Sequence, residues 1–341
     1  MKKWLTVLVL AGLLVLFGCG TSEDAGSANE NNTNNSNAEN QSSSEGEKAY
    51  TVGVTQIVEH PSLDAALEGF QKALEDAGLN VEYSIENAQG DPKNNPTIAD
   101  KLIGNGVDLI FANSTPSAQS VLAATEEIPI VFTSVTDPVG AELVGSMDQG
   151  GPNITGTTDT HPDAIPNTID FMKNEIGIET IGVVYNAGEQ NSVAQIERVK
   201  ELADEKGISV EEATVSTSAE VKQATESLLG KVDAFYIITD NTVVSTLESV
   251  LMVGEAEKLP VFVGELDSVE RGGFAAYGFD YYDIGYEAGE KAVQILKGEK
   301  TTAELPVSYP QNLKLVINKT AAGNMGVELK DSWNDIAEFT E

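Results

Sequence analysis

From residue 49 onward, short apolar runs alternate with amphipathic segments, and this alternation limits the possible folds more than any other sequence feature. The first run covers residues 50–57, and apolar residues then follow at helical spacing from Leu63 to Leu74. The other strand-like runs cover residues 81–85, 107–112, 128–132, 180–185, 232–239 and 259–263, and the helix-length segments between them include residues 193–206 and 243–258. Strands that alternate with helices predict an α/β fold with doubly wound parallel sheets, and about 290 residues suffice for two lobes.

The loops that follow the strand-like runs are the expected place for a ligand. In open parallel sheets, ligands bind beyond the carboxyl ends of the strands. These loops are mostly polar and cover residues 56–60, 113–119, 133–138, 185–192, 240–242 and 264–267.

The loop at residues 113–117 precedes a helix that begins near Ala118, so its backbone N–H groups and hydroxyls can cradle an anion. Ser114 and Thr115 are the candidates for this role. The same geometry serves a simple helix cap, and both interpretations stay open here. For a ligand carboxylate, the helix N-terminus is the favoured holder, with Arg271 near a Gly-Gly turn as the alternative.

Acidic side chains on these loops are candidates for holding an ammonium group. They are Asp137, Asp159, Glu189, Asp240, Glu265 and Asp267. Asp240 is favoured because it directly follows the apolar run 234–239 and is therefore expected at a strand tip. Tyr185, at another strand end, can supply an aromatic wall or a cation–π contact. The alternatives are a solvated surface charge for the acids and a place in the core for Tyr185.

Composition and motifs favour binding over catalysis. With 20 basic and 54 acidic residues the formal net charge is −34, which would repel nucleic acid. One cysteine and two histidines make a transition-metal site a weak hypothesis, and turn or cap roles are favoured for His60 and His161, each before a proline. Walker A, GxGxxG and Gly-x-Ser-x-Gly patterns are absent from the sequence. We therefore predict no enzyme, no metal and no cofactor.

The N-terminus predicts export. Lys2 and Lys3 precede fourteen residues of apolar sequence, residues 4–17, which is shorter than the roughly twenty that a bilayer span needs. The ending Leu16-Phe17-Gly18-Cys19 resembles a bacterial lipobox; the alternative is a signal peptide that is cut elsewhere. Residues 21–48 contain no apolar side chain larger than alanine and favour a disordered coil. We predict a lipoprotein signal peptide (1–18), lipidation at Cys19, a polar tether (19–48) and an extracytoplasmic protein anchored to the cell membrane.

Seven motifs in order carry a family resemblance. They are Gln56 with His60-Pro61 and Leu63-Asp64, Gln89-Gly90-Asp91, Thr115-Pro116 with Ala118-Gln119, Val135-Thr136-Asp137-Pro138, Asn153-Ile154-Thr155-Gly156, Tyr185-Asn186 with Glu189 and Asn191-Ser192, and Asp240-Asn241. Together they resemble the substrate-binding lipoproteins of ABC transporters, in the family that includes the tryptophan-binding TrpX-type proteins.

The resemblance implies a type I periplasmic-binding-protein fold, with two lobes joined by three crossovers and a ligand cleft between them. Lobe 1 is expected to comprise residues 49–160 and 270–302, and lobe 2 residues 161–269 and 303–341. An amino acid is the implied ligand, with tryptophan or another aromatic one foremost. By position, Ser114 and Thr115 would bind its carboxylate and Asp240 its amine. The remaining expected ligand-binding residues are Gln56, Thr136, Asp137, Tyr185, Glu189, Asn191 and Asn241. The stretch 264–267 is less typical of the family.

The predicted function is that of a monomeric receptor that captures an amino acid by cleft closure and delivers it to an ABC permease in the membrane. One alternative is a sensory receptor coupled to a membrane signalling protein. Another is an importer receptor for a different small solute. Transport and sensing use the same closure, so the sequence leaves both open.

Overall fold

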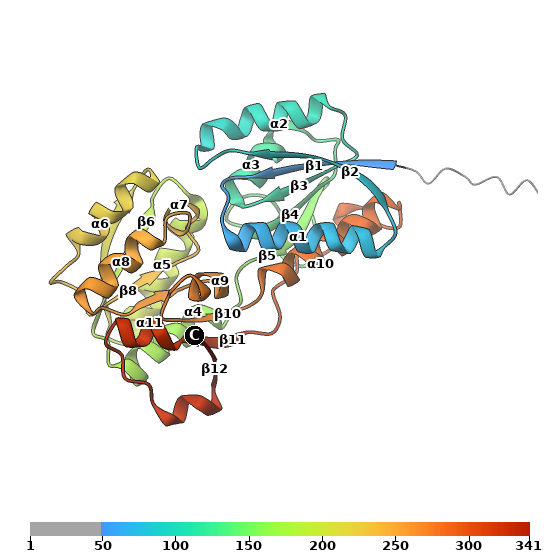
Figure 1. Cartoon of the computed structure of the whole chain (residues 1–341). Coiled ribbons are helices and arrows are strands. Elements are labelled where there is room, and N and C mark those ends of the chain that lie inside the picture. Colours follow the sequence, from blue (N-terminus) through green and yellow to red (C-terminus); the bar gives the residue numbers. More distant parts are fainter. Residues whose placement is uncertain (1–48) are drawn as a thin grey trace, which may run out of the picture. The chain divides into compact units, whose positions relative to one another are not determined.

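The computed structural model describes residues 49–341, which form two β-sheets covered by helices (Figure 1). The predicted signal peptide, Cys19 and the tether lie outside the described residues. Within residues 49–341, no helix combines the length and apolar character that a bilayer crossing requires. The predicted α/β class with mostly parallel sheets is confirmed.

Lobe 1 is built on a five-stranded parallel sheet with the order β2-β1-β3-β4-β5. Its strands are β1 (Ala49–Gln56), β2 (Asn80–Asn87), β3 (Leu109–Asn113), β4 (Ile130–Val135) and β5 (Ile154–Thr158). The helices between them are α1 (Pro61–Asp76), η1 (Pro92–Asn94), α2 (Asn95–Gly104) and α3 (Thr115–Ala124). The three central strands, β1, β3 and β4, have largely apolar sequences because helices cover the sheet on both faces.

Lobe 2 is built on a seven-stranded sheet with the order β12-β11-β10-β9-β8-β6-β7, in which only β10 and β11 pair antiparallel. The strands are β6 (Thr180–Asn186), β7 (Ser209–Val215), β8 (Ala234–Ile237), β9 (Val261–Val263), β10 (Ala275–Gly278), β11 (Lys314–Asn318) and β12 (Ala337–Thr340). The helices are α4 (Ala164–Phe171), which continues as the π-helical turn η2 (Met172–Ile176), α5 (Gln190–Glu205), η3 (Ser218–Glu220), α6 (Val221–Ser227), α7 (Asn241–Val244), α8 (Glu248–Glu257), α9 (Leu266–Glu270), α11 (Lys319–Asn324) and η5 (Asp331–Asp335).

The division of the chain between the lobes remains a proposal, and sheet membership shifts two of its predicted boundaries. β10 pairs with β9 and β11 in lobe 2, so the return to lobe 1 lies after Gly278 and not near residue 270. The Ser308 carbonyl accepts from the N–H of Thr158, and Leu305 accepts from Thr155, so residues up to 308 stay with lobe 1. We propose three crossings: after Thr158, after Gly278 and between residues 308 and 314.

After the second crossing, α10 (Tyr281–Leu296) returns to pack along α1, and η4 (Thr302–Glu304) follows it. Figure 1 shows α10 next to α1 although more than 200 residues separate them. The approach is so close that a Cβ atom on Gly285 would lie 1.9 Å from the Ala66 carbonyl oxygen. Glycine at this position therefore lets the two helix backbones touch.

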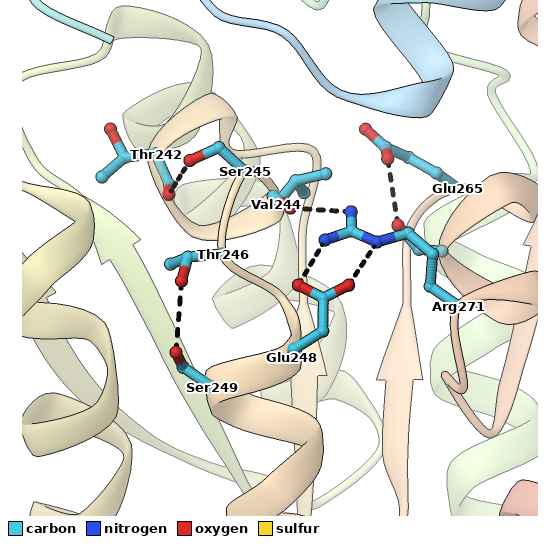
Figure 2. A network of polar contacts seen from close by, with 9 residues as sticks. Thr242, Val244, Ser245, Thr246, Glu248, Ser249, Glu265 and Arg271 are labelled. Carbon is cyan, nitrogen blue, oxygen red and sulfur yellow. Dashed lines mark hydrogen bonds and ion pairs between the residues drawn. The ribbon is translucent and has the colours of Figure 1, made fainter.

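The single helix expected over residues 243–258 is interrupted, and Arg271 occupies the break (Figure 2). Its Nη1 donates to the Val244 carbonyl at the end of α7 at 2.8 Å. Its Nε and Nη2 donate to the two carboxylate oxygens of Glu248, at the start of α8, both at 2.8 Å. Ser245 also bonds back to the Thr242 carbonyl, which is how serine competes with a regular helix. Arg271, the alternative carboxylate holder, thus already has a bidentate partner.

Candidate functional site

A cleft of about 1050 Å³ lies between the two lobes and is lined by segments from both of them. Lobe 1 contributes Ile57, Val58, Gln89–Lys93, Asn95, Pro96, Pro116, Gln119, Ser120 and Ala123, and lobe 2 contributes Asn186–Gln190, Thr214–Ser218, Asn241, Thr242 and Ser245. Most of these residues directly follow β1, β2, β6, β7 and β8. The cleft therefore lies at the carboxyl edges of both sheets, where parallel α/β folds bind ligands.

The start of α3 supplies a free hydroxyl beside this cleft. Ser114 is the N-cap: its Oγ accepts from the Ser117 N–H at 3.4 Å, and its φ of 116° is one that few non-glycine residues adopt. Thr115 follows it, is 1% exposed, and its Oγ1 has no hydrogen-bond partner. Pro116, the next residue, lines the cleft. The helix cap and the free hydroxyl thus belong to different side chains, Ser114 and Thr115.

Gln56, at the end of β1, stabilises by hydrogen bonds the loop that leads into α1. Its Nε2 donates to the Val58 carbonyl and to Asp64 Oδ1, each at 2.8 Å, and its Oε1 accepts from Asn113 Nδ2 at 3.0 Å. Asn113 Nδ2 also donates to the Leu63 carbonyl at 2.7 Å. Gln56 therefore fixes the loop after β1 relative to β3, one residue before the cleft-lining Ile57.

Glu189 organises the lobe 2 side of the cleft. Its carboxylate accepts from Asn241 Nδ2 at 2.6 Å, from Thr242 Oγ1 at 2.7 Å and from Asn191 Nδ2 at 3.2 Å. The backbone N–H groups of Asn241 and Thr242 also donate to it. Asn191 keeps a buried Oδ1 without a partner. Of the residues predicted from sequence, Glu189 and Asn241 line the cleft, and Asn191 lies beside it.

Asp240 is fully buried, and both of its carboxylate oxygens accept hydrogen bonds from groups of its own lobe. Its Oδ2 accepts from the Asn186 N–H and from Ser192 Oγ, both at 2.6 Å, and its Oδ1 accepts from the Val243 N–H at 2.8 Å. Burial, and then the neighbouring Glu189 charge, raises the pKa of Asp240 to about 7. The contacts of Asp240 are those of a buried helix cap for α7.

Three other predicted residues are not among the residues that line the large cleft. Tyr185 donates its hydroxyl to Glu212 on β7 at 2.9 Å, and its ring packs in the lobe 2 core. Thr136 and Asp137 line a separate cavity of about 270 Å³. The Thr136 hydroxyl accepts from Gln195 Nε2 of lobe 2 at 3.2 Å, whereas Asp137 accepts from the Gly140 N–H in a turn.

A second group of polar residues joins the two lobes, and we call it the interlobe cluster: Ser62, Asp159, Glu265, Ser268 and Tyr281. Ser62 Oγ, from α1, donates to Glu265 Oε2 at 2.8 Å, and Ser268 Oγ donates to the same oxygen at 3.1 Å. The Tyr281 hydroxyl donates to Asp159 Oδ2 at 2.9 Å. Burial raises the pKa of Glu265 to about 7 and that of Asp159 to about 6.

Sequence reasoning placed Asp159 and Glu265 on strand-end loops among several acids but did not select them. No sequence pattern pointed to Ser62 or Tyr281 as site residues, because serine and tyrosine are common near the starts of helices. His60, expected to serve a turn or cap, precedes α1 without a side-chain capping bond. It is 5% exposed, its Nδ1 has no partner, and burial lowers its pKa to about 3, so it stays neutral.

Raised carboxyl pKa values predict how stability depends on pH. Burial raises the pKa of Glu265 to about 7, that of Asp240 to about 7 and that of Asp159 to about 6, above the ordinary values of 4.5 for glutamate and 3.8 for aspartate. The folded state then binds more protons than the unfolded state between about pH 4 and 7, so stability falls as pH rises through this window. We expect a higher Tm at pH 5.5 than at pH 8, with a smaller difference in Glu265→Gln. An equal pH dependence in both proteins would contradict a raised Glu265 pKa.

Acids are abundant, but residues 49–341 contain no group of three or more histidine, cysteine, aspartate or glutamate side chains placed to hold a metal ion. The buried carboxylates described above bond to hydroxyl, amide and backbone N–H donors instead.

Two α/β lobes with a cleft at the edges of both sheets define a bilobal solute-binding protein. The family model for ABC transporter substrate binding proteins matches residues 51–339, and the chain belongs to this family. Members of this family are extracytoplasmic solute-binding proteins and not enzymes, and the fold is that of type I periplasmic binding proteins. The resemblance predicted from the seven motifs is therefore confirmed.

Three relatives show the similarity in detail. The chain is 39% identical to the tyrosine-binding protein of Clostridioides difficile (strain R20291), over 93% of this chain and 91% of that one. It matches an ABC domain from Streptococcus pneumoniae in complex with L-Trp at 33% identity and a TM-score of 0.81, over 86% of this chain and 99% of that one. It matches the ligand-free, open structure of a substrate-binding protein with adhesive properties from Clostridium difficile at 38% identity and 0.64, with the same coverage.

These two structural matches differ in a way that sequence divergence does not explain. The L-Trp complex is the less identical of the two, yet it superposes better, with a TM-score of 0.81 against 0.64 for the open structure. The whole folded part of this protein therefore superposes better on the L-Trp complex than on the open structure. Within this protein, a buried hydrogen bond joins Ser62 of lobe 1 to Glu265 of lobe 2.

Proposed function

We propose that the protein is the lipid-anchored receptor of an ABC importer for an aromatic amino acid. The observation that carries the proposal is the cleft of about 1050 Å³ that both lobes line at the carboxyl edges of their sheets. The relatives that match nearly the whole folded part support the ligand class, since one is a tyrosine-binding protein and another was solved with L-Trp.

Each end of an amino acid finds a suitable surface in this region. The ligand carboxylate would bind at the start of α3, where Thr115 offers a buried hydroxyl without a partner and α3 offers its N-terminal N–H groups. The aromatic side chain would lie against apolar lining residues such as Ile57, Val58 and Val215. Because the lobes contribute different contacts, the ligand favours the closed arrangement and shifts the population toward it.

Anchoring and delivery complete the proposal. The apolar segment 4–17, the lipobox-like end at Cys19 and the polar tether support an exported lipoprotein held at the membrane. Such a tether would keep the receptor near its permease while the lobes open and close. No cofactor is needed for capture by closure.

A thermal-shift experiment tests the ligand class. The purified protein is heated with L-tyrosine, L-tryptophan, L-phenylalanine, the other amino acids and a panel of sugars and nucleosides. At a hundredfold excess over Kd, one-site binding adds about 2.7 kcal/mol, or roughly 5 °C in Tm for a domain of this size. We expect this shift with one or more aromatic amino acids. A shift with a sugar or nucleoside alone would overturn the ligand class while keeping the binding function.

A further inference from the structure

The interlobe cluster holds two buried carboxyl groups that pair with no cation among residues 49–341. Glu265 is 3% exposed and Asp159 is 8% exposed. None of the ion pairs formed by residues 49–341 includes either of them. Burying a carboxylate without a positive partner is costly, so an uncompensated pair at one place calls for an explanation.

The hydrogen bonds of this cluster are incomplete as well. Asp159 Oδ2 accepts from Tyr281, but Asp159 Oδ1 is buried and has no partner. Both hydroxyls that reach Glu265, from Ser62 and Ser268, donate to the same oxygen, Oε2. Two acceptor oxygens, Asp159 Oδ1 and Glu265 Oε1, thus remain for a further donor.

The interlobe cluster is not among the residues that line the cleft of about 1050 Å³, but it too lies between the lobes, in segments that follow strands. Asp159 directly follows β5, Ser62 lies in the first turn of α1, and Glu265 lies two residues after β9. Segments that follow three strands of the two sheets therefore meet here, with Ser62 from lobe 1 bonding to Glu265 from lobe 2. A group bound at this point would contact both lobes and would favour their closure.

We propose that Asp159 and Glu265 form the subsite for the ligand's primary ammonium group, with Ser62 as its lobe 1 partner. This inference rests on the proposed function, because it takes the ligand to be an amino acid. A primary ammonium carries three N–H donors and one positive charge, which matches two carboxyl groups and a hydroxyl oxygen. Asp240, for which the family resemblance implied this role, already accepts hydrogen bonds from three donors of lobe 2.

A proton movement follows from this assignment. Burial raises the pKa of Glu265 to about 7, so in the free protein near pH 7 this carboxyl is often protonated. Asp267 and Tyr281 are the other titratable groups that act on this pair: Asp267 also raises the pKa of Glu265, and Tyr281 bonds to Asp159. Arg271 is paired with Glu248, and its charge acts on His60, whose pKa burial and that charge lower. An incoming ammonium favours the charged carboxylate, so binding releases a proton and affinity falls as pH falls below 7.

Two ligands and four proteins test the subsite. The full-length protein, Glu265→Gln, Asp159→Asn and Glu270→Gln are titrated with L-tyrosine or L-tryptophan and with the deaminated analogue of the same side chain. Glu270 is the last residue of α9, the helix that Glu265 precedes as N-cap, and it is exposed, which makes it the control for Glu265. We expect Glu265→Gln and Asp159→Asn to lose roughly 10- to 100-fold in amino-acid affinity, with little change for the analogue. Glu270→Gln should match the wild type.

The outcomes separate this inference from the proposed function. Unchanged amino-acid affinity in both cluster variants, or an equal loss for amino acid and analogue, overturns the ammonium subsite. A wild-type protein that ignores aromatic amino acids but binds another primary amine through Glu265 overturns the proposed ligand and keeps the subsite. If no primary amine binds, both the proposed function and the ammonium subsite are overturned. Calorimetry in two buffers of different ionisation enthalpy adds a second readout: proton release at pH 7 in the wild type and its loss in Glu265→Gln.

Discussion

Replacement of Asp240 by alanine is expected to lower the free energy of unfolding by about 4 kcal/mol. The side chain is fully buried and accepts from the Asn186 N–H, Ser192 Oγ and the Val243 N–H. Losing an N-cap costs about 1 kcal/mol, and each buried donor left without a partner costs about 1 to 3 kcal/mol more. Chemical denaturation of the purified variant and wild type measures the difference.

Asp280 provides the matched control for this change. It caps α10 by accepting from the Tyr282 N–H at 2.9 Å, but it is exposed and makes no buried contacts of the kind Asp240 makes. Asp280→Ala should cost only about 1 kcal/mol. Equal losses in the two variants would show that the network around Asp240 does not support the fold. An Asp240→Asn protein of normal stability that no longer distinguishes an amino acid from its deaminated analogue would restore Asp240 as the amine ligand.

The location of the cleft was predictable from sequence because strand ends are a property of short segments. Apolar runs identify the strands, and the residues after them must lie at the sheet edge. Glu189 and Asn241, chosen for that reason, line the cleft. Ser114 and Thr115 were chosen as a pair, and the structure divides the cap and the free hydroxyl between them.

The choice between neighbours on a strand is harder, as Tyr185 and Asn186 show. Successive strand residues point to opposite faces, so an error of one residue selects the wrong face. Tyr185 bonds to Glu212 on β7, whereas Asn186 lines the cleft and donates to Thr242 Oγ1 at 2.9 Å. The apolar run alone gives no information about which of the two faces the ligand.

Contacts between segments that are distant in the chain could not be predicted from a single sequence. Ser62 and Glu265 are 203 residues apart, and their hydrogen bond exists only because the two lobes meet. Strands with weak patterns were missed for a related reason. β7, with the sequence SVEEATV, is a largely exposed edge strand, so its glutamates hide the apolar signal. β10 has four residues, and its partners in the sheet define it better than its composition does.

Gly285→Ala is expected to lower the free energy of unfolding by about 3 kcal/mol, or roughly 6 °C in Tm. A Cβ at this position would lie 1.9 Å from the Ala66 carbonyl oxygen, which belongs to the backbone of α1 and cannot rotate away. Helices α1 and α10 would have to separate, and the buried side chains of Phe70 and Ala288 between them would lose contact. Denaturant unfolding of the purified variant measures the loss.

Gly323→Ala is the control, because Gly323 lies in helix α11 with no heavy atom within 4 Å of the added Cβ. Alanine there should be neutral or slightly stabilising, since it favours the helix. Equal stability of the two variants would contradict the close contact between α1 and α10. Separation of the helices should also weaken amino-acid binding, because α1 begins at Pro61 and carries Ser62 to its contact with Glu265. Gly285, about one turn along α10 from Tyr281, would then act on ligand affinity through the position of Ser62.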